Sequence, residues 1–240
     1  TLSLHDALPI SDIRKIVGEN NTSLKIATMA DVGRTIKEEI PPKSESVVDM
    51  IRVATYIHQL PEAIELIEDF HAKGYETTCN IMAISKSFDD ELEQVLETLS
   101  KTNVDVIYIA DSFGSFYPEQ INKLTAKYLG ASKPVGKKVG IHAHNNLTLA
   151  YANTLEAMIY GTSYLDVTVS GLGRGAGNCA MELLLGFLKN PKYKLVPVLK
   201  FIETFIVPLE RELDWGPSVP YILTGHLNEH PRPAMKARDE

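Results

Sequence analysis

Two histidines two residues apart, His142 and His144, have the spacing in this sequence that most directly suggests chemistry. They end a short apolar stretch, residues 138–144. On a strand, residues i and i+2 point to the same face, so the two imidazoles are expected to lie side by side. Neutral imidazoles are common ligands of divalent metals, and the pattern therefore indicates a metal site. The alternative is a hydrogen-bonded core histidine next to a loop histidine.

A glycine-rich segment, Gly171–Asn178, follows the next apolar stretch and precedes a helix-like run. Its G-x-G-x-x-A pattern matches a dinucleotide-binding fingerprint. That fingerprint also needs an acidic residue about 20 positions later, at the end of a strand. Residues 190–193 read Asn-Pro-Lys-Tyr and supply none, so we do not expect a dinucleotide site. Backbone N–H groups of such a loop can still hold a substrate anion, and Gly175 is our candidate there.

Composition narrows the function classes. The chain has 240 residues, of which 44% are hydrophobic and 23% charged, as in an ordinary globular domain. Its net charge of -7, with no basic run, argues against a nucleic-acid partner. No apolar stretch approaches the roughly 20 residues of a membrane helix. Cys79 and Cys179 are isolated and form no motif, so we expect a reducing, cytoplasmic setting.

Short apolar runs alternate with amphipathic ones along the chain. We expect strands at residues 24–29, 50–55, 75–84, 104–110, 138–144 and 164–170, with helices at 61–73, 89–99, 118–129 and 147–160. Strands that are apolar throughout and alternate with helices predict a parallel sheet. Two architectures remain open: a doubly wound sheet, or an eight-unit barrel of about 250 residues.

Polar residues concentrate where these strands end, which is where parallel α/β folds gather their reactive groups. The residues that follow or end the strands are Thr55, Asp111, Ser112, His142, His144, Asn145, Asn146 and Asn178.

The two ends of the chain differ from its middle. Residues 1–11 resemble translated sequencing-adaptor DNA, and we expect them to be a non-native leader. Residues 12–213 carry the repeating pattern and end in a helical run at 195–213. Residues 214–240 form a proline-containing tail, which we expect to pack across the fold or against a partner. Tyr221 of this tail is a candidate for the barrel mouth, whereas His5, His71, His226 and His230 read as surface or tail residues.

Three motifs in order carry a family resemblance: Ala110–Gly114 (ADSFG), His142–Asn146 (HAHNN), and the glycine-rich loop with Glu182 behind it. Together they resemble the metal-dependent lyase and aldolase superfamily of TIM barrels, which includes hydroxymethylglutaryl-CoA lyase and the isopropylmalate and citramalate synthases. The closest likeness is to bacterial proteins of the 4-hydroxy-2-oxovalerate aldolase type. The resemblance runs from about residue 12 to the end.

The resemblance implies a set of site residues. His142 and His144 would bind a divalent metal, Mn²⁺ or Mg²⁺ in the first place and Zn²⁺ or Co²⁺ otherwise. Asn178 would lie at or beside that metal. Asp111 and Ser112 would contact the substrate, and we add Thr55 and Gly175 to the substrate-binding candidates.

One family motif is missing. The family's first strand carries an Arg-Asp-Gly sequence that supplies a metal ligand and an enolate-stabilising arginine, followed by a histidine base. This sequence has no Arg-Asp-Gly. We therefore expect an N-terminally truncated TIM (β/α)₈ barrel with about six of eight units, and the catalytic residues stay unknown.

The resemblance implies a carbon–carbon lyase that cleaves a 4-hydroxy-2-oxo acid to pyruvate and an aldehyde. One alternative is a Claisen-type acyltransferase that joins acetyl-CoA to a 2-oxo acid. The other is an inactive partial barrel, because two imidazoles alone hold Mn²⁺ or Mg²⁺ weakly. The expected partners are a small 2-oxo acid substrate and a second copy of the chain or a dehydrogenase.

Overall fold

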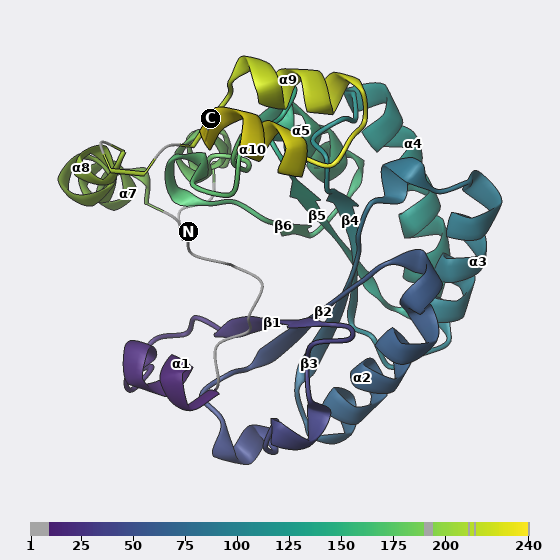
Figure 1. The fold of residues 1–240 in the computed structure, drawn as a ribbon. Coiled ribbons are helices and arrows are strands. Elements are labelled where there is room, and N and C mark those ends of the chain that lie inside the picture. Colours follow the sequence, from purple (N-terminus) through teal and green to yellow (C-terminus); the bar gives the residue numbers. More distant parts are fainter. Residues whose placement is uncertain (1–9, 190–193, 211, 214, 240) are drawn as a thin grey trace. The chain divides into compact units, whose positions relative to one another are not determined.

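Six strands form one parallel sheet whose spatial order is their order along the chain (Figure 1). They are β1 (Ala27–Asp31), β2 (Met50–Thr55), β3 (Glu76–Ile81), β4 (Val106–Asp111), β5 (Lys138–Ala143) and β6 (Tyr164–Leu165). From β2 onward an α-helix follows each strand, so each new strand is added beside the previous one. This is the arrangement of a partial TIM barrel and not of a doubly wound sheet, in which the strand order reverses.

The computed structural model describes residues 10–189, 194–210, 212–213 and 215–239. These residues divide into two units. The first contains the described residues up to 82, with 87–108 and 130–139, and the second contains 83–86, 109–129 and 140–240. Short 3₁₀ turns lie at Lys37–Glu39, Lys43–Glu45, Ile57–Gln59, Ile84–Lys86, Lys133–Val135 and Val169–Gly171.

The first unit is built on β1, β2 and β3, which pair in parallel. Its helices are α1 (Ile10–Val17), α2 (Leu60–Ala72) and α3 (Asp89–Ser100). Helix α2 begins with a proline in its first turn and packs on β2 and β3 (Figure 1). The apolar residues that it buries recur at helical spacing: Ala63, Leu66, Ile67 and Phe70.

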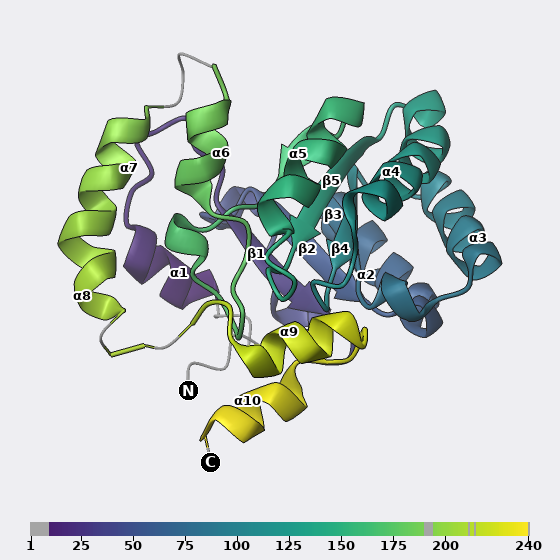
Figure 2. The ribbon, with the colours of Figure 1, turned by 90° about the horizontal axis from the view of Figure 1, so that it is seen from above.

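The second unit holds α5 (Ala150–Tyr160), α6 (Met181–Phe187), α7 (Leu195–Phe201), α8 (Val207–Leu209), α9 (Val219–His226) and α10 (Arg232–Asp239), with most of α4 (Pro118–Ser132). Helices α9 and α10, which come from the tail, lie side by side in both views (Figures 1 and 2). A small buried cluster of Ala176, Tyr221 and Ala234 joins the tail to the glycine-rich loop.

The sixth strand is much shorter than residues 164–170, and that prediction was wrong in its length. Asp166 N still donates to Ile141 O of β5 (2.9 Å). Beyond it the backbone leaves β5, and Thr168 pairs with Ala180 instead. Ser170 then adopts a left-handed conformation with φ of 52°, which no strand can contain. The alternation of polar and apolar residues in this stretch therefore belongs to a loop.

Other predicted boundaries differ as well, most clearly at the two ends of the chain. The single helix predicted at 195–213 is divided into α7, a π-helical segment (Ile202–Ile206) and α8. Pro208 explains the break, because it has no N–H to donate to the carbonyl four residues earlier. Of the expected leader 1–11, residues 1–9 lie outside the described residues, and α1 begins at Ile10.

We expect Ile67→Ala to lower the free energy of unfolding by about 3 kcal/mol, because it leaves a cavity under α2 where the side chain is fully buried. Urea unfolding followed by circular dichroism measures this. The matched change Glu62→Ala, on the exposed side of the same helix, should cost less than about 0.5 kcal/mol. Equal losses in the two variants would contradict the placement of α2.

Candidate active site

Main-chain pairing joins the end of β5 to the glycine-rich loop. His144 and Asn178 form an antiparallel bridge, and Asn145 N donates to Gly177 O (2.9 Å). The loop is closed by Asn178 N, which donates to Gly171 O (2.9 Å). The two motifs that the sequence placed about one helix apart are therefore neighbours in the second unit.

Each histidine of the pair has its Nδ1 held by an acceptor. His142 Nδ1 donates to Asp166 Oδ2 (2.9 Å), and His144 Nδ1 donates to the backbone oxygen of Asp111 (3.0 Å). Neither acceptor has a proton to give, so the proton of each neutral ring lies on Nδ1 and the lone pair on Nε2. The ring centroids are 4.9 Å apart. Histidines that bind a metal through Nε2 commonly have Nδ1 hydrogen-bonded to a carboxylate or a backbone oxygen, and both rings of this pair have that arrangement.

Only one of the two polar atoms of the Asn178 side-chain amide has a hydrogen-bond partner among the described residues. Nδ2 donates to Leu172 O (3.2 Å), whereas the buried Oδ1 has no hydrogen-bond partner among the described residues. A Cβ at position 173 would lie 2.3 Å from Nδ2, so only glycine leaves room for this amide. A buried oxygen without a donor costs free energy, and a cation would satisfy it.

Asp111 and Ser112, which the sequence predicts to contact substrate, are hydrogen-bonded to neighbouring loops. The fully buried Asp111 carboxyl accepts hydrogen bonds from the N–H groups of Ser115 (3.0 Å) and Phe116 (3.3 Å). Ser112 Oγ accepts one from Ala83 N (2.9 Å). Both side chains therefore shape the loops that follow β3 and β4.

Burial controls the protonation of two groups in this region. Burial raises the pKa of Asp111 to about 7, against the opposing backbone N–H groups and the charge of His142. Burial, and then the positive charge of His142, lower the pKa of His144 to about 3. His144 is consequently a neutral imidazole at physiological pH, the form that binds a metal.

The other two substrate-binding candidates, Thr55 and Gly175, belong to different units. Thr55 belongs to the first unit, where it is fully buried at the end of β2, and its hydroxyl donates to Tyr56 O (3.0 Å). Gly175 lies under the ring of Tyr221 with φ of 63°, and a Cβ there would be 3.1 Å from Tyr221 Cε1. The loop backbone at Gly175 is thus covered by the tail.

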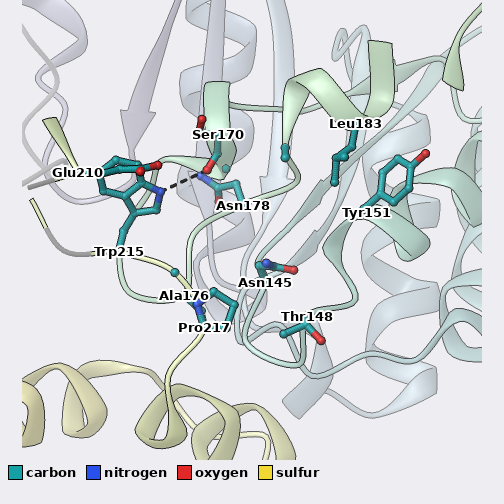
Figure 3. Close-up of a pocket in the computed structure, with 13 residues that line it drawn as sticks. Asn145, Thr148, Tyr151, Ser170, Ala176, Asn178, Leu183, Glu210, Trp215 and Pro217 are labelled. Atoms are coloured by element: carbon teal, nitrogen blue, oxygen red, sulfur yellow. Dashed lines mark hydrogen bonds between the residues drawn. The ribbon is translucent and has the colours of Figure 1, made fainter. Parts of the chain in front are cut away.

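A cavity of about 390 Å³ in the second unit is lined by Asn178, one of the three metal candidates, but not by His142 or His144. Figure 3 shows Asn178 and Asn145 between Trp215 on one side and Tyr151 on the other, with Leu183 near Tyr151. Trp215 Nε1 donates to Ser170 O (3.2 Å), which ties the start of the tail to the loop (Figure 3). The volume is within the range of small-molecule sites.

The sequence did not indicate that Asp166 contacts His142, or which residues the tail contacts. Asp166 lay in a stretch interpreted as a strand, although a carboxylate two dozen residues after a His-x-His pair is a partner to look for. Asn146 Nδ2 donates to Thr224 Oγ1 (3.3 Å) of α9, and no local signal predicts that contact. His230, interpreted as a surface or tail residue, lies in the tail and is half-buried, with its ring against Phe113 (centroids 5.8 Å apart).

No group of three His, Cys, Asp or Glu side chains in the described part of the chain is arranged to hold a metal. The donors brought together are two imidazole nitrogens, with an amide oxygen on the residue paired to His144. Such a set leaves coordination positions for water or for substrate oxygens.

The profile of the HMGL-like family matches residues 24–203, three quarters of the chain. The chain belongs to the HMGL-like family. The match covers all six strands, the histidine pair and the glycine-rich loop, so the motifs that first suggested a lyase or aldolase lie inside the family region.

Curated relatives of this HMGL-like chain include two named activities. An oxaloacetate decarboxylase from Mycobacterium tuberculosis is 33% identical over 143 residues, which are 60% of this chain and 42% of the relative. A 4-hydroxy-2-oxovalerate aldolase from Geobacillus thermodenitrificans is 28% identical over 189 residues, 77% of this chain and 54% of the relative. The chain spans about half the length of the curated relatives it matches.

Among solved structures, the N-terminal domain of a candidate aldolase from Bacteroides vulgatus superimposes with a TM-score of 0.78 and 29% identity. The alignment covers 96% of this chain and 77% of that one. These relatives and this structural neighbour are named as a decarboxylase or an aldolase, both of which break carbon–carbon bonds. Separately, none of the helices in the described ranges has the length and apolar character needed to cross a bilayer.

The two shifted pKa values predict how stability depends on pH. Between pH about 4 and 7, folded Asp111 keeps its proton while unfolded Asp111 has lost it, so this group makes the free energy of unfolding fall as pH rises. Between pH about 3 and 6.5, unfolded His144 is protonated and folded His144 is not, so this group makes the free energy of unfolding rise as pH rises. In the wild type the two contributions largely oppose each other.

We expect Asp111→Asn to remove the falling contribution. The slope of unfolding free energy against pH should become more positive, by at most about 1.4 kcal/mol per pH unit, between pH 4 and 7. Urea unfolding at half-unit pH steps measures the slope. Glu119→Gln removes an exposed carboxyl from α4 and is the control. An Asp111→Asn slope identical to that of the wild type would show that the carboxyl is not held protonated.

Proposed function

We propose that this protein is a divalent-metal-dependent aldolase that cleaves a 4-hydroxy-2-oxo acid to pyruvate and an aldehyde. One observation carries the proposal: both histidines of the pair have Nδ1 bound to an acceptor, which leaves two Nε2 lone pairs for a cation. The relatives named 4-hydroxy-2-oxovalerate aldolase support the reaction class. Since the chain spans about half of those relatives, the substrate is part of the proposal.

The residues present fit a divalent cation. His142 and His144 would bind it through Nε2, and Asn178 Oδ1 is the buried oxygen that a cation would satisfy. Mixed nitrogen and oxygen donors suit Mn²⁺ or Mg²⁺, with Zn²⁺ or Co²⁺ as alternatives. When bound, such an ion supplies Lewis acidity that stabilises the negative charge developing on an enolate oxygen.

The chain's own residues prepare that site in three ways. Asp166 fixes the ring orientation and tautomer of His142, and Asp111 does the same for His144 through its backbone oxygen. Burial keeps His144 unprotonated, so its nitrogen is available without the loss of a proton. The cavity beside Asn178 has room for a small acid and carries the hydroxyl and amide groups that would orient it.

A second candidate activity is decarboxylation of oxaloacetate, which the relative from Mycobacterium tuberculosis favours. Loss of carbon dioxide from oxaloacetate breaks a C–C bond at the same position and also gives the pyruvate enolate. The same cation site would serve both reactions, so they differ only in the group that leaves.

We propose that residues 12–213 form the catalytic part of the chain and that residues 214–240 form a tail that contributes to the site. In the second unit, described tail residues contact the glycine-rich loop and the end of β5. A dehydrogenase that consumes the aldehyde, or a second copy of the chain, stays a predicted partner.

Pyruvate release from 4-hydroxy-2-oxopentanoate, coupled to lactate dehydrogenase, tests the function. We expect turnover that requires added Mn²⁺ or Mg²⁺ and falls at least about 100-fold in His142→Ala, because one of the cation's nitrogen ligands is lost. His71→Ala removes an exposed histidine of the first unit and is the matched control. Turnover without a metal, or turnover unaffected by His142→Ala, would contradict the proposal, whereas release from oxaloacetate alone would select the second candidate.

We expect Asp166→Asn to weaken Mn²⁺ binding about 10- to 100-fold, because an outer partner of a ligating histidine is lost. Titration followed by the EPR signal of free Mn²⁺ measures this without any turnover. Glu156→Gln, a carboxylate of α5 bonded to Asn122 and not to a histidine, is the control. An unchanged dissociation constant in Asp166→Asn would place the metal elsewhere.

A further inference from the structure

The cavity that Asn178 lines has large apolar walls as well as polar ones. Tyr151, Leu183 and Trp215 border it together with the amides of Asn145 and Asn178 (Figure 3). All of these residues belong to the second unit. A ligand that reaches the two amides would therefore also meet two aromatic rings and an aliphatic side chain.

The three apolar side chains come from separate elements, each of which is held in place. Trp215 Nε1 donates to Ser170 O (3.2 Å), and the next backbone N–H along the chain donates to Gly175 O (3.0 Å). Tyr151 lies in the first turn of α5 and Leu183 in α6, and these two helices contact each other. The walls are thus positioned before a ligand arrives, which lowers the entropic cost of binding.

The apolar side chains at this cavity are only partly covered by the rest of the chain. Leu183 keeps 51% of its surface exposed, and Tyr151 and Trp215 are half-buried. In Figure 3 the hydroxyl of Tyr151 points away from the two asparagines, so a ligand beside them would contact the ring carbons. Apolar surface in a concave site contributes free energy when a ligand removes it from water, and these walls therefore favour an apolar ligand group.

The cavity is large for an acid that has only a methyl group on C4. Its volume is about 390 Å³. A closed apolar cavity of roughly 150 Å³ is enough to bind benzene. The cavity therefore has room for a small carboxylic acid and, in addition, for a group of the size of a phenyl ring.

The charge at the cavity is negative. Among the described residues that line it, Glu210 is the charged one, and it is exposed. A second carboxylate on a ligand would be repelled by Glu210, although solvent screens that repulsion. It would also lose hydration beside the apolar walls, which is the larger cost. Both effects favour an uncharged ligand group.

The proposed aldol cleavage leaves one part of the substrate free to vary. The first three carbons become pyruvate whichever aldehyde is released, whereas the group on C4 becomes the side chain of that aldehyde. Asn178 is both a candidate donor to the cation and a lining residue of the cavity. An acid held at that cation through its carboxylate and 2-oxo oxygens therefore has the cavity next to it for the group on C4.

We propose that the cavity binds the group on C4 and selects 4-hydroxy-2-oxo acids in which that group is apolar, uncharged and about as large as a phenyl ring. Tyr151, Leu183 and Trp215 are the specificity-determining residues. The inference rests on the proposed function. It adds no bond-making or bond-breaking step to the cleavage and defines which aldehyde is released.

Binding of three matched 2-oxo acids tests the inference without turnover. 2-Oxopentanoate, 2-oxo-4-phenylbutanoate and 2-oxoglutarate carry a methyl, a phenyl and a carboxylate group on C4, and none has the C4 hydroxyl that aldol cleavage requires. Calorimetric titration with Mn²⁺ present should give the phenyl acid a dissociation constant at least about 10-fold lower than that of 2-oxopentanoate, because more apolar surface leaves water. 2-Oxoglutarate should bind more weakly than 2-oxopentanoate.

Truncation of the walls makes the test specific. Leu183→Ala and Tyr151→Ala should each lower the ratio of the dissociation constants, methyl acid to phenyl acid, by about 3-fold, and the double variant should lower it further. Tyr151→Phe keeps the ring and should keep the ratio. Circular dichroism checks that each variant is folded.

The matched controls remove exposed apolar side chains elsewhere in the second unit. Tyr160→Ala changes α5, which also carries Tyr151, and Leu199→Ala changes α7. Neither residue is among the described ones that line the cavity, so both variants should leave the ratio unchanged. Equal binding of the methyl and phenyl acids to the wild type, a preference that survives the double truncation, an equal loss in the controls, or tightest binding of 2-oxoglutarate would each overturn the inference.

Mn²⁺ titration by EPR separates this inference from the proposed function. If Mn²⁺ binds through His142 but none of the three acids binds, the proposed substrate class is wrong and the inference fails with it. If the methyl and phenyl acids bind with equal affinity, the metal site and the substrate class stand, and only the role of the cavity is overturned.

Discussion

The site depends on the backbone pairing between the end of β5 and the glycine-rich loop. Through the bridge of His144 with Asn178 and the bond from Asn145 N to Gly177 O, a strand end and a loop from different βα units have one fixed geometry. Main-chain hydrogen bonds are directional and nearly obligatory once buried, so they set side-chain positions within narrow limits. The loop can approach this closely only because Gly173 leaves space for the Asn178 amide.

On that backbone the local electrostatics favour neutral groups. Burial raises the pKa of Asp111 and lowers that of His144, so both lose their charge for the same reason, the cost of removing an ion from water. A site with few fixed charges but several oriented lone pairs is suited to a cation, because the cation supplies the charge and the protein fixes the orientation of the lone pairs that bind it. The carboxyl group of Asp166 lies beside His142, with Oδ2 2.9 Å from His142 Nδ1.

The C-terminal segment belongs to the same site. Tyr221 covers Gly175, Asn146 binds α9, and Asn228 holds the following turn to the loops after β3 and β4. These contacts are hydrogen bonds and close packing of buried groups, which hold a segment more firmly than exposed ion pairs do.

The sequence by itself determined the order and type of the strands and main helices, because periodicity reports which residues avoid water over six to fifteen positions. It also determined that His142 and His144 share a face, since strand geometry alternates side chains. It overestimated the strand at 164–170, because alternation continues in a loop whose backbone pairs with Ala180 instead of β5. Only the tertiary structure decided that Asp166 orients His142, that Asp111 supports its own loop, and that His230 lies against Phe113. Each of these is a contact across 24 residues or more, or a choice between competing hydrogen-bond partners. Such contacts depend on how the elements pack, and no local pattern encodes that.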